Sequence, residues 1–167
     1  MANLDFHFKH PTTIQVSCPT LCGKTRLVVR ILEEQLVQQF PTRMIWVFSE
    51  WKPEYEQARA FYPQIEFVRG WSDKLYESLR QNENNLLIIN DQMVDAGDRK
   101  TLSNLNTKKA HNKNLTVLYL VQNVYNNSKS QRTVSLKTHY NVVFRNERDA
   151  SQFRSPLTYQ MQPGDGR

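Results

Sequence analysis

Apolar runs bounded by turn residues alternate along the chain with segments in which apolar residues recur at helical spacing. This alternation is typical of a mostly parallel β-sheet with helices on both faces. The expected strands are six: Thr12 to Ser17, Met44 to Phe48, Ile65 to Val68, Leu86 to Ile89, Leu115 to Val121 and Asn141 to Phe144. Because the fourth run has no polar residue, it predicts a central strand covered on both faces.

Two helices are expected between these strands. Apolar residues recur at helical spacing from Lys24 to Gln39, and Pro41 ends that helix. Pro53 lies where a second helix begins. With 167 residues, 39% of them hydrophobic, the chain has room for one well-buried core. We expect one α/β domain over residues 1–155 and an irregular C-terminal tail over residues 156–167 that is compatible with a truncated end.

Charge adds a first indication of function. Lys and Arg number 22 and Asp and Glu 16, so the formal net charge is +6, which favours a polyanionic partner such as nucleic acid. The N-terminus has no basic stretch followed by an apolar run, and no segment approaches the about 18 apolar residues of a membrane span. We therefore expect a soluble, unsignalled protein with no membrane partner.

The chain has two cysteines, Cys18 and Cys22. So few cysteines argue against the disulfide framework of a secreted protein and favour reduced thiols in an intracellular setting. His7 and His10 precede them, so a zinc site formed by all four is the alternative, although the His-x-x-His spacing is poor for it.

The segment between the first strand and the first helix carries the main chemical signal. Its second half, Gly23-Lys24-Thr25, matches the end of the phosphate-binding pattern Gly-x-x-x-x-Gly-Lys-Thr, while Cys18 replaces the first glycine. In such a loop, backbone N–H groups and a helix N-terminus meet the phosphates, the lysine reaches the β and γ phosphates and the threonine binds magnesium. The predicted nucleotide-binding residues are Cys18, Pro19, Thr20, Leu21, Cys22, Gly23, Lys24 and Thr25. The predicted fold is accordingly a P-loop NTPase three-layer sandwich.

Two more strands end in residues that suit the same site. The run Leu86 to Ile89 is followed by Asn90 and Asp91, which predicts a magnesium contact at Asn90, shared with Thr25, and a general base at Asp91. The run Leu115 to Val121 is followed by Gln122, whose amide could sense the γ phosphate. The alternative is that these polar residues only turn the chain at strand ends.

The order of these motifs resembles that of the FtsK/HerA-type genome-packaging ATPases, especially those of Polinton (Maverick) elements and related eukaryotic DNA viruses. The resemblance spans nearly the whole chain, from Phe6 to Arg148, and includes the stretches Leu-Val-Gln-Asn and Thr-Val-Ser-Leu. It implies an ATP- and Mg²⁺-dependent homo-oligomeric ring that moves double-stranded DNA into a capsid, with capsid or portal proteins as partners. It also implies an intracellular location, in the host nucleus or cytoplasm, and association with the virion.

The same resemblance assigns catalytic roles. Lys24 would bind phosphate, Asp91 would activate water and Gln122 would be the sensor. Arg132 would reach the nucleotide of a neighbouring subunit, with Arg145 and Arg148 as rivals.

Basic residues in the second half of the chain could line a DNA pore, the alternative being solubilising surface charge. They are Lys108, Lys109, His111, Lys113, Lys129, Arg132 and Lys137. The tryptophans Trp46, Trp51 and Trp71 are expected to pack against the sheet.

Two other functions stay open. Cys18 and Asn90 depart from the family pattern of glycine and an acid, which motivates a degenerate relative that binds nucleotide or DNA with little or no hydrolysis. The short length also suits a small-molecule P-loop kinase, although no arginine-rich lid segment is evident.

Overall fold

A computed structural model describes residues 6–19, 21–90, 105, 112–122 and 138–144. Six strands form one sheet in the order β3-β2-β4-β5-β1-β6. All five strand pairs are parallel. The strands are β1 Thr13–Ser17, β2 Arg43–Phe48, β3 Glu66–Arg69, β4 Asn85–Asn90, β5 Leu115–Val121 and β6 Tyr140–Val143. The predicted parallel sheet is confirmed, with β4 in the interior as expected and β5 beside it.

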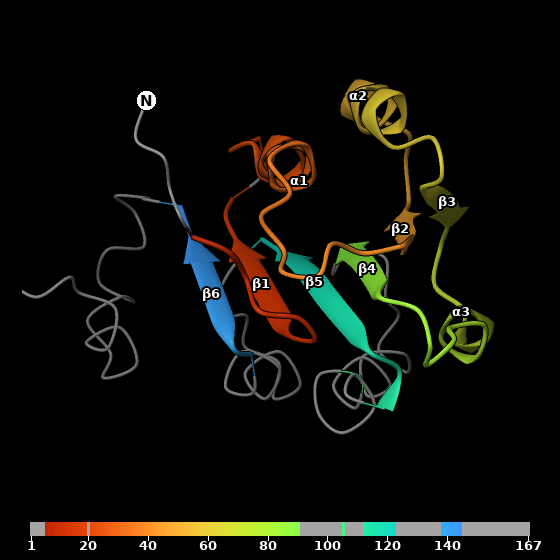
Figure 1. Cartoon of the computed structure of the whole chain (residues 1–167). Helices are drawn as coiled ribbons and strands as arrows, with labels where there is room; N and C mark the ends of the chain where they lie inside the picture. The colour runs from red at the N-terminus through yellow and green to blue at the C-terminus, as the bar shows by residue number, and fades with distance from the viewer. Residues whose placement is uncertain (1–5, 20, 91–104, 106–111, 123–137, 145–167) are drawn as a thin grey trace, which may run out of the picture.

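Helices cover both faces of this sheet. Helices α1 (Lys24–Glu33) and α2 (Pro53–Phe61) lie over one face, and α3 (Asp73–Glu77) lies on the other (Figure 1). Alternate residues of a strand therefore enter different cores: Leu86 packs with the residues of α1 and α2, and Leu87 packs on the side of α3. This arrangement has three layers, as predicted.

The first helix is shorter than its apolar pattern suggested. It ends at Glu33, whereas the sequence predicted helix as far as Gln39. Gln35 has a left-handed backbone with φ of 51°, which turns the chain out of the helix. Val37 then forms a parallel bridge with Phe8 and is buried there. The apolar residues beyond Glu33 thus fill the core as extended chain.

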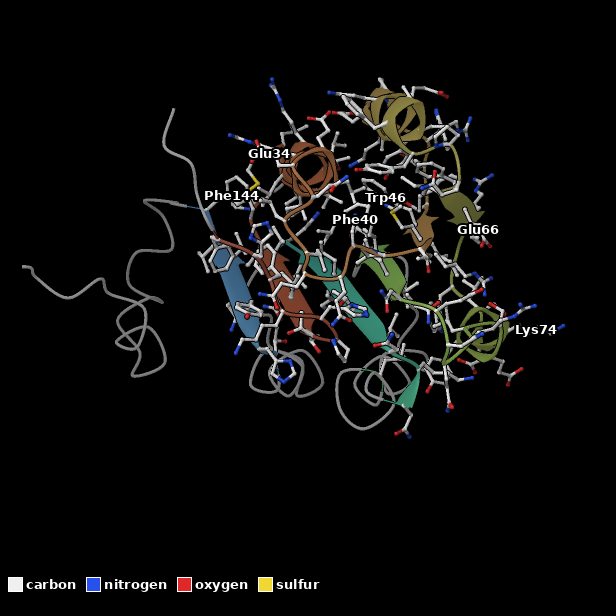
Figure 2. The ribbon with its side chains drawn as sticks, in the orientation of Figure 1. Glu34, Phe40, Trp46, Glu66, Lys74 and Phe144 are labelled. Carbon is white, nitrogen blue, oxygen red and sulfur yellow. A yellow bond between two sulfur atoms is a disulfide. The ribbon has the colours of Figure 1, made fainter. Side chains whose placement is uncertain are left out.

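Aromatic side chains fix α2 against the sheet. Tyr55 of α2 packs against Trp46, Phe48 and Phe67, with ring centroids 4.9, 5.9 and 5.6 Å apart respectively. Trp46 is buried between the sheet and this helix, as predicted (Figure 2). Burial, together with the nearby charge of Glu54, raises the pKa of Tyr55 to about 12. The start of α2 is therefore held at a fixed place beside the sheet.

Parallel strands put all their carboxyl ends at one edge of the sheet. The loop after β1, the end of β4, the residue after β5 and the start of α2 after β2 all belong to that edge. Ligands of open parallel sheets bind there. Among the described residues, no helix has both the length and the apolar character needed to cross a bilayer.

Candidate nucleotide-binding site

The loop between β1 and α1 is held in place by backbone contacts. The N–H of Cys18 donates to the carbonyl of Val121, at 3.1 Å, which ties the start of the loop to the end of β5. The N–H of Cys22 donates to the carbonyl of Pro19, at 3.4 Å. Leu21 has a φ of 65° and is fully exposed at 100%. The loop is therefore a tight turn that projects from the sheet edge.

Gly23 makes the transition from loop to helix. It is the N-cap of α1 and has a φ of 98°, in the left-handed region that a side chain disfavours. A Cβ atom at Gly23 would meet nothing within 4 Å, so backbone conformation, not crowding, calls for glycine here. This conformation sets Lys24 and Thr25 in the first turn of α1, where a helix attracts anions.

The Lys24 side chain folds back over the loop. Its Nζ donates to the carbonyl oxygen of Cys18 and, at 3.2 Å, to that of Pro19. The ammonium thus lies across the mouth of the turn, where a phosphate group would be received. A phosphate could replace these carbonyls as the partner of Lys24, because an ionised acceptor makes the stronger hydrogen bond.

The loop borders a cavity of about 360 Å³. This volume lies within the usual range for small-ligand sites. The cavity brings together eight residues that the sequence assigned to one site: Pro19, Leu21, Cys22, Gly23, Lys24, Thr25, Asn90 and Gln122. Its other lining residues are Arg26, Lys52, Glu54 and Leu120.

Three charged residues of this cavity were not expected from the sequence. Arg26, Lys52 and Glu54 line it alongside the predicted residues. Lys52 is the N-cap of α2 and Glu54 lies in the first turn of that helix. The sequence did contain a signal for Lys52 and Glu54, because Pro53 marked the start of the helix that follows β2. In a parallel sheet, that position lies at the same edge as the loop. Lys24, Arg26 and Lys52 against Glu54 give this lining a net positive charge, which suits a polyphosphate.

The oxygen donors of the cavity fit a magnesium ion bound together with a nucleotide. Magnesium prefers oxygen ligands and keeps several waters and substrate phosphates in its shell. The Thr25 hydroxyl and the Asn90 amide oxygen are such donors, and Thr25 is 9% exposed. Both are uncharged, and Glu54 is the carboxylate that lines the cavity within the described part of the chain.

Several predicted site residues lie outside the described residues. They are Thr20, Asp91 and Arg132, with the rivals Arg145 and Arg148. The same holds for six of the seven basic residues proposed for DNA contact. The seventh, Lys113, donates to the carbonyl of Leu79 at 2.9 Å and lies 5.7 Å from the Tyr76 ring centroid. Lys113 therefore makes contacts within the fold, at the sheet edge opposite the cavity.

The cysteines differ from the expectation of reduced thiols. Cys18 and Cys22 are joined by a disulfide, with their Cα atoms 6.2 Å apart. The left-handed Leu21 turns the chain between them and brings them within bonding range. Cys18 is nearly buried, at 2% exposed, while Cys22 lines the cavity. The disulfide uses both sulfurs of the alternative zinc site, and no group of three metal-binding side chains occurs among the residues described.

No protein-family model and no curated protein sequence matches this chain. Solved structures do resemble it. The cytoplasmic domain of EssC aligns with a TM-score of 0.54 and 12% identity, over 93% of this chain and 36% of that one. The helicase domain of Hef from Pyrococcus furiosus aligns with a TM-score of 0.50 and 12% identity, over 89% of this chain and 36% of that one.

The chain spans about a third of the length of these two solved chains, 36% of each. At 12% identity the likeness concerns the fold alone. A six-stranded parallel sheet, helices on both faces and a Gly-Lys-Thr loop after the first strand agree with it. The chain therefore has the α/β fold of P-loop NTPases.

Proposed function

We propose that this chain is the ATP-binding domain of a motor that moves double-stranded viral DNA into a capsid. The observation that carries nucleotide binding is the position of Lys24, whose ammonium crosses the loop at a cavity shared with Asn90 and Gln122. The net positive lining supports a polyphosphate ligand. The packaging role rests on the order of motifs along the chain and on its net charge of +6.

Each residue of the cavity has a distinct task in this proposal. Lys24 leaves the carbonyls of Cys18 and Pro19 and binds the β and γ phosphates. Thr25 and Asn90 hold Mg²⁺, which neutralises charge on the phosphates when it is bound. Gln122 contacts the γ phosphate or orients the attacking water. These tasks need the side chains at one edge of the sheet, and the proposal is supported by their common position on the lining of one cavity.

Two carboxylates compete for the general base. Asp91 follows Asn90 in the sequence, and Glu54 lines the cavity from the first turn of α2. A general base must lie within hydrogen-bond reach of the water that it deprotonates. Comparing Asp91→Asn with Glu54→Gln identifies it, because only loss of the true base lowers turnover while nucleotide binding persists.

The direct test is ATP hydrolysis with and without magnesium and double-stranded DNA. We expect magnesium-dependent turnover that duplex DNA stimulates and that Lys24→Ala abolishes. The control is Lys74→Ala, because the Lys74 side chain extends into solvent from α3, on the other face of the sheet (Figure 2). Absence of hydrolysis under every DNA and assembly condition, or wild-type turnover in Lys24→Ala, would contradict the proposal.

A second function is favoured by Cys18 and Asn90. The Cys18 side chain stands where the motif has glycine, and Asn90 offers magnesium a neutral oxygen in place of a carboxylate. A protein that binds nucleotide but hydrolyses it slowly would have these features. The double variant Cys18→Gly with Asn90→Asp separates the two functions, since a large gain in turnover identifies these residues as the cause of slow hydrolysis.

A further inference from the structure

The two cysteines bracket the phosphate loop and are the only cysteines of the chain. Cys18 directly follows β1, and Cys22 directly precedes Gly23 and the first turn of α1. Their disulfide closes a ring around the turn at a sequence separation of 4. Each Cys therefore has a single possible partner within the chain, and that partner lies at the other end of the same loop.

In this closed loop, groups that would bind phosphate are engaged with the loop itself. The N–H of Cys22 donates to the carbonyl of Pro19, and the Lys24 ammonium donates to the carbonyls of Cys18 and Pro19. A phosphate cradle needs such backbone N–H groups and the lysine to point at the ligand. Nucleotide binding thus requires that the loop give up these internal contacts, and a covalent link between its ends opposes that change.

We propose that Cys18 and Cys22 are a reversible redox switch, in which the dithiol form binds nucleotide and the disulfide form holds the phosphate loop closed. The inference rests on the proposed nucleotide binding and adds its regulation. The switch gives a function to Cys18, the residue at the first position of the motif. A glycine at that position could only let the backbone approach the phosphate, because it has no thiol.

Thiol–disulfide exchange with a small disulfide such as oxidised glutathione supplies the chemistry. The thiolate of Cys22, the residue that lines the cavity, attacks one glutathione sulfur, a mixed disulfide forms and one glutathione thiolate leaves. The Cys18 thiolate then attacks the sulfur of Cys22, and the second glutathione leaves. Two electrons pass from the cysteines to the glutathione disulfide, and the two cysteine protons end on the two released glutathione molecules.

The test measures the affinity for a fluorescent ATP analogue with the protein equilibrated in reduced or in oxidised glutathione. Alkylation followed by mass spectrometry counts the free thiols in each sample. We expect two thiols and tight binding in the reduced wild type, and no thiol and about tenfold weaker binding in the oxidised form. Dithiothreitol should restore the affinity.

Cys22→Ser is the matched control, because it keeps a polar side chain on the cavity and cannot form the disulfide. We expect its affinity to be the same in both glutathione buffers. Equal affinity of the oxidised and reduced wild type, or two free thiols after oxidation, would overturn the switch while leaving nucleotide binding intact. Absence of binding in the reduced wild type and in Cys22→Ser would overturn the proposed function, and the switch with it. Since the main comparison uses wild-type protein, a poorly folded variant does not affect it.

Discussion

Strand β4 begins and ends with asparagine, and the two residues lie in opposite environments. Asn85, at the amino edge, is fully buried at 0% exposed, and its Nδ2 donates to the carbonyls of Arg80, Glu83 and Lys113 at 2.8, 3.1 and 2.7 Å. Asn90, at the carboxyl edge, is partly exposed and lines the cavity. Asparagine therefore stabilises the fold at the amino end of β4 and borders the candidate ligand cavity at its carboxyl end.

Lysines show the same contrast. Lys113 donates to the carbonyl of Leu79 at the amino edge, and Lys24 donates to the carbonyls of Cys18 and Pro19 at the carboxyl edge. Of these two lysines, Lys24 is the one that borders a cavity into which a ligand could bring better acceptors. The hydrogen bond of Lys113 to a backbone carbonyl therefore stabilises the fold at the amino edge. The hydrogen bonds of Lys24 hold its ammonium group beside the cavity at the carboxyl edge.

The largest expected effect is on nucleotide affinity and separates the two lysines. Lys24→Ala should weaken ATP binding roughly 100-fold, because it removes a charge-assisted contact to the phosphates. Lys113→Ala should leave affinity unchanged and lower the free energy of unfolding. Calorimetric titration and urea denaturation of both variants measure this. A similar loss of affinity in the two variants would show that the edges are not functionally distinct.

The next effect is on stability and concerns Asn85. Asn85→Ala should lower the free energy of unfolding by about 2 kcal/mol, since three backbone carbonyls lose the buried amide that donates to them. Chemical denaturation measures the change. Nucleotide affinity, measured on the fraction that remains folded, should stay near wild type. A strong loss of affinity would mean that the amino edge also shapes the cavity.

A smaller effect is expected at the other end of β4. Asn90→Asp should raise magnesium-dependent turnover by about tenfold, because a carboxylate binds the ion better than an amide does. Stability should change little, since Asn90 is not buried. Steady-state hydrolysis over a range of magnesium concentrations tests this. Unchanged turnover would show that the neutral amide of Asn90 does not limit hydrolysis.

The smallest expected effect is a pH dependence at the amino edge. Burial lowers the pKa of His10 below its ordinary value of 6.5, against the opposite effect of a hydrogen bond with Asn114. The fold thus favours the neutral imidazole, whose Nδ1 lies 2.7 Å from the hydroxyl of Thr116. The stability that this contributes is complete above pH 6.5 and is lost as pH falls below it towards the lower pKa of the folded state.

Urea midpoints across this pH range, for wild type and His10→Asn, measure the effect. The variant should lose less stability on acidification. Parallel curves for the two proteins would assign the acid sensitivity to other groups.

The interior of the sheet could be predicted from the sequence, and the details of its edge could not. An uninterrupted apolar run such as Leu86 to Ile89 has one stable environment, between two covered faces. Leu36 and Val37, by contrast, keep helical spacing and yet belong to extended chain, because spacing does not reveal a backbone that turns left-handed at Gln35. The pattern of apolar residues predicts which residues are buried. The local backbone conformation decides whether they are buried as helix or as extended chain.

The candidate site likewise has features that the sequence could predict and features that it could not. Lys24, Thr25, Asn90 and Gln122 could be grouped in advance, because each follows or ends a strand of a parallel sheet. The same reasoning would have found Lys52 and Glu54. The pairing of Cys18 with Cys22 could not be predicted, since it depends on the turn at Leu21.

The placement of Trp51 gives the protein an intrinsic optical reporter. Its side chain is 41% exposed, and its ring centroid lies 4.7 Å from Cζ of the Arg59 guanidinium. In the sequence, Trp51 directly precedes Lys52, which lines the cavity. Trp46 is buried at 1% exposed and so keeps the same surroundings. We expect a ligand that draws Lys52 inward to alter the polarity around the Trp51 indole and so to change the tryptophan emission, and we expect Trp51→Phe to remove that change.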